Sequence, residues 1–173
     1  MVNRVPREKV VGKRRTAREI ALQMLYQRDL AGSELAGIFD AFDAPAYLVA
    51  QQEGDGDAGR RPRLGERLRR QLAEALGYAR DLVQGTVDHL GEIDGLIREQ
   101  AANWRLERMP VVDRNILRLA VYEMMFEQDI PKLVVLDEAI ELAKKFGSEQ
   151  SSRFVNGLLD GLLKSQSFPG SMT

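Results

Sequence analysis

Residues 16–25 read Thr-Ala-Arg-Glu-Ile-Ala-Leu-Gln-Met-Leu, and this stretch indicates the fold class. Its apolar side chains recur at intervals of three and four residues, at Ala17, Ile20, Ala21, Met24 and Leu25. Because an α-helix turns about once every 3.6 residues, this spacing places all of them on one helix face. Gly32 is the predicted end of this helix, and Ser33 is the predicted N-cap of the next one.

The same helical period continues over most of the chain. We expect further helices at about 34–50 (kinked or broken at Pro45), 64–90, 92–103, from Pro110 onward, at 132–146, and after an N-cap at Ser148. No segment alternates strictly between apolar and polar residues, as a half-buried strand would. The sequence therefore predicts an all-α fold of about seven helices.

The predicted domain organisation is simple. Residues 1–13 are predicted to be a mobile basic arm, and residues 165–173 a tail. Residues 14–164 form a helical domain, with subdomains at about 14–90 and 91–164. Residues 51–63 contain several glycines, a proline and no large apolar residue, so we expect a disordered loop that is dispensable for folding.

Composition excludes several classes of protein. The chain has no cysteine, which excludes disulfides and thiolate chemistry, and it has no apolar run of the roughly 20 residues that a membrane span requires. We therefore expect a cytoplasmic protein that does not engage membranes. The only histidine, His89, is expected at the surface or at its boundary, so neither a metal site nor a cofactor is predicted. The net charge of −1 argues neither for nor against a nucleic-acid partner, so the local distribution of charged residues has to be examined.

Basic residues gather near the N-terminus. Residues 1–18 hold one acid, Glu8, and the basic residues Arg4, Arg7, Lys9, Lys13, Arg14, Arg15 and Arg18. On the first helix we expect an exposed stripe of Arg15, Glu19, Leu22 and Tyr26, with Arg14 and Arg18 beside it. An exposed tyrosine among arginines suits single-stranded nucleic acid, because bases stack on aromatic rings while cations hold the backbone. The alternative, a basic tail that only solubilises the chain, stays open.

Two other basic regions have both a functional and an ordinary interpretation. One spans the loop and the following helix and comprises Arg60, Arg61, Arg63, Arg67, Arg69 and Arg70. It could extend an RNA surface or be a solvated helix face. The other flanks the turn at residues 147–148 and comprises Lys144, Lys145, Phe146 and Arg153. The amides at a helix N-terminus could bind a phosphate there, or the turn could serve only to join two core helices.

Four blocks of sequence resemble one known family. They are residues 14–26, 112–123 (Val-Asp-Arg-Asn-Ile-Leu-Arg-Leu-Ala-Val-Tyr-Glu), 138–147 and 154–160. In order and spacing they are similar to the NusB family, over about residues 14–164. The resemblance implies two three-helix bundles set across each other, with one extra helix. It also implies binding of the boxA element of ribosomal RNA leader transcripts, a heterodimer with the ribosomal protein NusE, and action on the transcription elongation complex.

The resemblance also implies site residues. It places RNA contacts on Arg14, Arg15, Arg18, Tyr26, Phe146, Gln150 and Phe154, to which we add Lys13, Lys144 and Arg153 for their charge. It centres the partner surface on an exposed Asp113, with Arg114 and Tyr122. Gln150 stands where some family members have an acid, and the N-terminal arm and the loop at 51–63 are long for the family.

Two other functions stay open at this point. A module of the same fold could bind protein, or itself as a homodimer, without RNA. The fold also occurs fused to RNA methyltransferases, but no cysteine is present for cytosine methylation and we expect no catalytic domain. The leading hypothesis is a non-enzymatic adaptor that binds single-stranded RNA.

Overall fold

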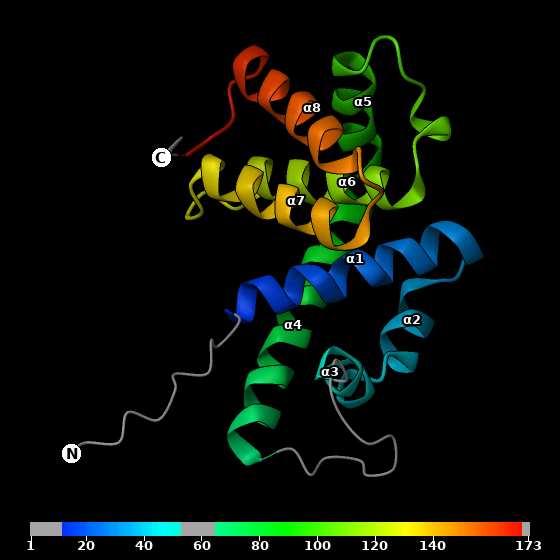
Figure 1. Ribbon diagram of the computed structural model, residues 1–173, viewed down its shortest axis with the longest axis vertical. Helices are drawn as coiled ribbons and strands as arrows, with labels where there is room; N and C mark the ends of the chain where they lie inside the picture. The colour runs from blue at the N-terminus through cyan, green and yellow to red at the C-terminus, as the bar shows by residue number, and fades with distance from the viewer. Residues whose placement is uncertain (1–11, 53–64, 171–173) are drawn as a thin grey trace, which may run out of the picture.

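A computed structural model describes residues 12–52 and 65–170, which form eight α-helices, one short 3-10 helix and no strand (Figure 1). The helices are α1 (Lys13–Ala31), α2 (Leu35–Ala41), α3 (Ala44–Gln52), α4 (Glu66–Asp88), α5 (Leu90–Gln100), η1 (Leu106–Arg108), α6 (Val111–Phe126), α7 (Lys132–Phe146) and α8 (Ser151–Ser165). The prediction of an all-α fold is confirmed, with one α-helix more than expected.

The additional helix arises because the predicted helix at 34–50 is two helices. The chain leaves α2 at Phe42 and starts α3 at Ala44, so the break comes just before Pro45. The Asp43 carboxylate accepts a hydrogen bond from the Ala46 amide at 2.9 Å, which caps the new helix. Proline is tolerated in such a first turn, because its missing N–H has no intrahelical partner there.

One of the predicted helix ends is confirmed and two predicted caps are wrong. Gly32 closes α1 in the left-handed conformation, at φ 62°, with its N–H bonded to the Arg28 carbonyl. The N-cap positions of α2 and α8 are occupied by Glu34 and Gln150, not by Ser33 and Ser148. Ser148 instead donates its N–H to Ser151 Oγ at 2.9 Å, so one more turn of chain precedes α8.

Helix α6 occupies the centre of the molecule. It packs against α1, α4, α5, α7 and α8. Helix α1 lies on the side of α6 and α7 that is away from α8, and it crosses α4 there (Figure 1). Gly85 permits the close approach of α4 and α6, because a Cβ there would lie 2.2 Å from the Tyr122 ring. The buried apolar residues form one continuous cluster from Ala17 to Leu163. The division into subdomains near residue 90 stays a prediction.

Several predictions fall outside the described residues. They concern the arm before Gly12, which includes Arg4, Arg7 and Lys9, and the stretch at 53–64, which includes Arg60, Arg61 and Arg63. Within the predicted tail, residues 165–170 are described, and Phe168 packs against the core. Within the described ranges, no helix is long and apolar enough to cross a membrane.

Candidate nucleic-acid interface

Two of the four residues in the predicted exposed stripe on α1 are buried, as is Arg18 beside it. Glu19 and Leu22 are buried, and Arg18 is only 4% exposed; Arg15 and Tyr26 remain accessible. The prediction of exposure was wrong for Arg18, Glu19 and Leu22, because other helices cover α1 on more than one face. Helices α4 and α6 pack against it, and Glu19 accepts hydrogen bonds from Tyr47 of α3 and Lys145 of α7, at 2.8 and 2.9 Å.

Arg18 is part of a buried ion pair. Its Nε lies 2.9 and 3.1 Å from the two carboxylate oxygens of Glu123 on α6. Burial raises the pKa of Glu123, although the charge and hydrogen bonds of Arg18 act in the opposite direction. In this arrangement Arg18 holds α1 against α6 and does not present its guanidinium to solvent.

The other cations at the start of α1 differ in whether a carboxylate of the protein already pairs with them. Arg15 makes two hydrogen bonds to Glu138 of α7, at 3.0 and 2.8 Å, and these lower the pKa of Glu138. Lys13 pairs with Glu74 of α4. Arg14 is exposed, its guanidinium lies 6.0 Å from the centroid of the Tyr78 ring, and no ion pair forms on it among the described residues. Arg14 is therefore the cation of this group that is best placed to meet a phosphate.

Two predicted RNA residues that are far apart in the sequence meet at one hollow. Tyr26 of α1, 40% exposed, and the half-buried Phe146 of α7 line a cavity of about 430 Å³. The remaining lining residues are Leu22, Gln23, Gln27, Phe42 and Val112. The Lys145 ammonium lies 5.3 Å from the centroid of the Phe146 ring, and the exposed Lys144 lies 3.4 Å from Glu141. An aromatic hollow with a cation beside one of its rings can accept a planar base and hold its phosphate.

The start of α8 carries the remaining predicted RNA residues. Gln150 and Arg153 are exposed, and Phe154 is half-buried. The Phe154 ring meets the ring of Trp104 edge-on, with 5.9 Å between centroids. The sequence reasoning missed Trp104, which is 65% exposed in the segment between α5 and η1. The available signal was a tryptophan between polar residues, Asn103 and Arg105, in a break between helices.

The predicted partner residue Asp113 is buried, so the expectation that it is exposed was wrong. It is 4% exposed and accepts a hydrogen bond from Ser151 Oγ at 2.6 Å. The contact joins the first turn of α6 to the first turn of α8. The sequence pattern could not reveal it, because Ser151 becomes a neighbour only after both helices have packed.

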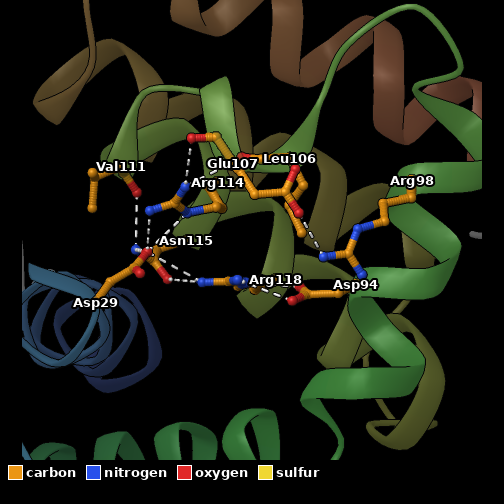
Figure 2. Close-up of polar contacts among 9 residues, drawn as sticks. All are labelled: Asp29, Asp94, Arg98, Leu106, Glu107, Val111, Arg114, Asn115 and Arg118. Atoms are coloured by element: carbon orange, nitrogen blue, oxygen red, sulfur yellow. Dashed lines mark hydrogen bonds and ion pairs between the residues drawn. The ribbon is translucent and has the colours of Figure 1, made fainter. Parts of the chain in front are cut away.

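Arg114 belongs to a polar network that links α1 to α5, η1 and α6 (Figure 2). Arg114 and Arg118 both contact the Asp29 carboxylate, at 2.7 and 3.2 Å, and Asn115 donates to it at 3.1 Å. Arg118 also makes a two-bond pair with Asp94 of α5, at 2.8 and 3.0 Å. Burial opposes ionisation of Asp29, but the hydrogen bonds of Arg114 and Asn115 and the two arginine charges outweigh it and lower its pKa.

The third predicted partner residue, Tyr122, is half-buried in an aromatic group. Its ring centroid lies 5.2 Å from that of Phe126 and 6.4 Å from that of His89. Phe126 is 40% exposed, so part of this group faces solvent. His89 is half-buried and lies 3.7 Å from Glu92, which confirms its predicted boundary position.

Comparison with known proteins identifies the family. The NusB family model matches residues 15–164. Transcription antitermination protein NusB of Myxococcus xanthus is 42% identical over 150 residues, covering 87% of this chain and 94% of the relative, and that of Trichlorobacter lovleyi is 45% identical over 152 residues, covering 88% and 91%.

Solved structures agree with this result. T. maritima NusB superposes with a TM-score of 0.65 at 36% identity, over 88% of this chain and 92% of that one. A chain from the crystal structure of the antitermination factors NusB and NusE in complex with dsRNA superposes with a TM-score of 0.64 at 28% identity, over 89% and 98%. The protein described here therefore belongs to the NusB family.

Proposed function

We propose that this protein is an RNA-binding transcription antitermination adaptor. It binds boxA-like single-stranded RNA together with NusE, acts in the cytoplasm on the transcription elongation complex, and catalyses no reaction. Family membership supports this proposal, as do relatives named as transcription antitermination proteins and a solved NusB–NusE complex with RNA.

The observation that carries the RNA site is the hollow between α1 and α7. Tyr26 and Phe146 supply aromatic surface for stacking, and Gln150 and Phe154 follow Phe146 along the chain at the start of α8. Phosphates are held by the exposed cations Lys13, Arg14, Lys144 and Arg153. Arg15 and Arg18 contribute indirectly, since their ion pairs with Glu138 and Glu123 keep α1 in place.

The test is a gel shift with a boxA-like RNA, in the presence and absence of NusE. Tyr26→Ala should weaken binding about tenfold, because stacking on an aromatic ring is worth roughly 1–3 kcal/mol per base. Tyr26→Phe should retain most of the affinity. Leu133→Ala is the matched control, because Leu133 is 43% exposed and lies in the first turn of α7, at the opposite end of that helix from Phe146.

The result also decides between the open functions. Single-stranded and double-stranded forms of the RNA are compared, because the complex noted above contains dsRNA. Binding to NusE, or self-association, without affinity for either RNA would establish a protein-interaction module and contradict the proposal.

Salt dependence offers a separate prediction on Arg14. Neutralising about four phosphates of a single strand gives a log–log salt slope of about −3. Arg14→Ala should make that slope shallower by about 0.7, the share of one phosphate contact. Arg67→Ala is the control, because Arg67 is also exposed but lies in the first turn of α4. If Arg67→Ala flattened the slope and Arg14→Ala did not, the RNA site would lie on α4.

We further propose that NusE docks on the α6 face around Tyr122, and that each protein alone binds RNA more weakly than the pair. Phosphate contacts position RNA without reading its sequence, so a composite surface strengthens binding by adding the partner's base contacts to the few that this chain offers. Asp113 and Arg114 support this face indirectly. Their contacts to Ser151 and Asp29 fix the start of α6.

Replacing Asp113 shows whether this residue stabilises the start of α6 or contacts NusE directly. Asp113→Asn keeps an acceptor for Ser151 but removes the charge, so the free energy of unfolding should fall by about 1 kcal/mol while NusE affinity stays unchanged. Urea denaturation and a pull-down titration measure the two quantities. Weaker NusE binding at unchanged stability would instead make Asp113 a contact residue.

A further inference from the structure

Trp104 stands out among the exposed apolar side chains. It is the only tryptophan of the chain, and it is 65% exposed, more than any other exposed large apolar side chain in the described part of the chain. Its one described ring contact is with Phe154, edge-on at 5.9 Å. An edge-on contact sets the rim of one ring against the face of the other, so at least one face of the indole is not covered by Phe154. Phe154 therefore holds the indole in place without covering it.

Exposed cations are frequent in the two chain segments that meet at Trp104 and Phe154. The segment at 101–109 and the first turn of α8 contain Arg105, Arg108 and Arg153, all exposed, against one acid, Glu107. Glu107 is itself paired with Arg98 at 2.9 Å. The nearest further acids along the chain are Glu99, in the last turn of α5, and Glu149, in the turn before α8, and both are exposed. With Arg98 and Glu107 paired to each other, three exposed arginines stand against two acids that have no ion pair among the described residues, and this excess of positive charge favours a polyanion over a neutral apolar partner.

Trp104 is connected to the hollow through Phe154 and the chain segment between Phe146 and Phe154. Gln150 and Phe154 are four residues apart at the start of α8 and lie on one side of the chain there. Phe146 precedes them across the turn at 147–150, and Trp104 follows them through its contact with Phe154. Aromatic side chains of this kind, spaced along a basic surface, are typical of proteins that bind single strands.

We propose that Trp104 is a base-stacking residue, and that an unpaired RNA base lies on its exposed face while Arg153 and Arg105 hold the flanking phosphates. This inference rests on the proposed RNA-binding function and extends the site beyond the residues named above. A duplex offers no free base face to this ring, so stacking on Trp104 favours single-stranded over double-stranded RNA.

The single tryptophan allows a direct test on the unaltered protein. Its fluorescence is followed while the full chain is titrated with a boxA-like single-stranded RNA, and a gel shift is run in parallel. We expect the emission to be quenched, with the same midpoint as the gel shift. Trp104→Ala should bind about tenfold more weakly, Trp104→Phe should keep most of the affinity, and the exposed-site control Leu30→Ala should bind like the parent.

A set of boxA-like RNAs, each lacking one base, identifies the base that stacks on Trp104. Removing the base that stacks on Trp104 should weaken binding to the parent and have no effect on Trp104→Ala. Circular dichroism melting of each variant establishes that it is folded.

The outcomes separate this inference from the proposed function. RNA binding with unchanged affinity in Trp104→Ala overturns the role of Trp104, whether or not the emission changes, and leaves the RNA-binding function intact. Absence of any gel shift, with and without NusE, overturns the proposed function and this inference with it.

Discussion

Replacing Asp29 by alanine should lower the free energy of unfolding by about 3 kcal/mol, because two arginines lose their shared carboxylate. Asp29 accepts from Arg114 at 2.8 Å and from Asn115 at 3.1 Å, and Arg118 lies 3.2 Å away. Breaking a buried ion pair costs about 3–5 kcal/mol. The Asp29 side chain is 20% exposed, which places the loss at the lower end of that range. Urea denaturation measures it.

The loss of unfolding free energy in Asp29→Ala should become smaller in acid. The pKa of Asp29 is lowered in the folded protein, so its stabilising contribution is complete above the unfolded value of about 3.9 and is lost as the pH falls through the folded value. The difference between parent and Asp29→Ala should therefore be constant near neutral pH and narrow below about pH 4. A difference that grows on acidification would mean that Asp29 is not ionised in the folded state.

A matched variant shows whether the network is responsible. Asp43→Ala removes an exposed acid that caps α3 through one hydrogen bond, and it should cost about 1 kcal/mol. If Asp29→Ala cost no more than this control, the network in Figure 2 would be a surface feature and would not hold α1 against α6.

The sequence predicted the helices well because their signals are local. Apolar residues three and four apart, as in Ala17 to Leu25, select helix wherever they later pack. Gly32 ended α1 as predicted, since a glycine needs no tertiary partner to adopt positive φ. The Ser148 prediction failed for the opposite reason. Its partner is Ser151, and Ser151 is held in turn by Asp113 from another helix.

The site was predicted less completely, because residue type does not reveal burial. Arg18 and Asp113 were expected to be exposed, but both are buried against helices that are far away in the sequence. Arg18 pairs with Glu123 of α6, and Asp113 accepts a hydrogen bond from Ser151 of α8. Tyr26 and Phe146, which the family resemblance named separately as RNA contacts, line one hollow, and their role in RNA binding stays a prediction. Trp104 was missed because its segment has no helical period, and because only the fold brings it to Phe154.

The buried pair between Arg18 and Glu123 carries the largest expected effect. Arg18→Ala should lower the free energy of unfolding by about 4 kcal/mol, because it leaves a carboxylate at a position that is 1% exposed without its counterion. Burial already raises the pKa of Glu123, and removing Arg18 removes the charge that opposes this shift. The carboxyl of the variant should therefore take up a proton more readily. The destabilisation should be greatest at neutral pH and smaller in acid.

A double variant then separates stability from RNA binding at the same position. Replacing both partners, as Arg18→Met with Glu123→Met, should recover most of the lost stability, because apolar residues of similar volume can substitute for a buried ion pair. If Arg18 only supports α1, the double variant should also bind boxA-like RNA as the parent does. Recovered stability with RNA binding still weakened would show that the guanidinium reaches the RNA, and that α1 shifts on binding to release it. A loss below about 1 kcal/mol in Arg18→Ala would place the pair in solvent, since exposed ion pairs are worth no more than that.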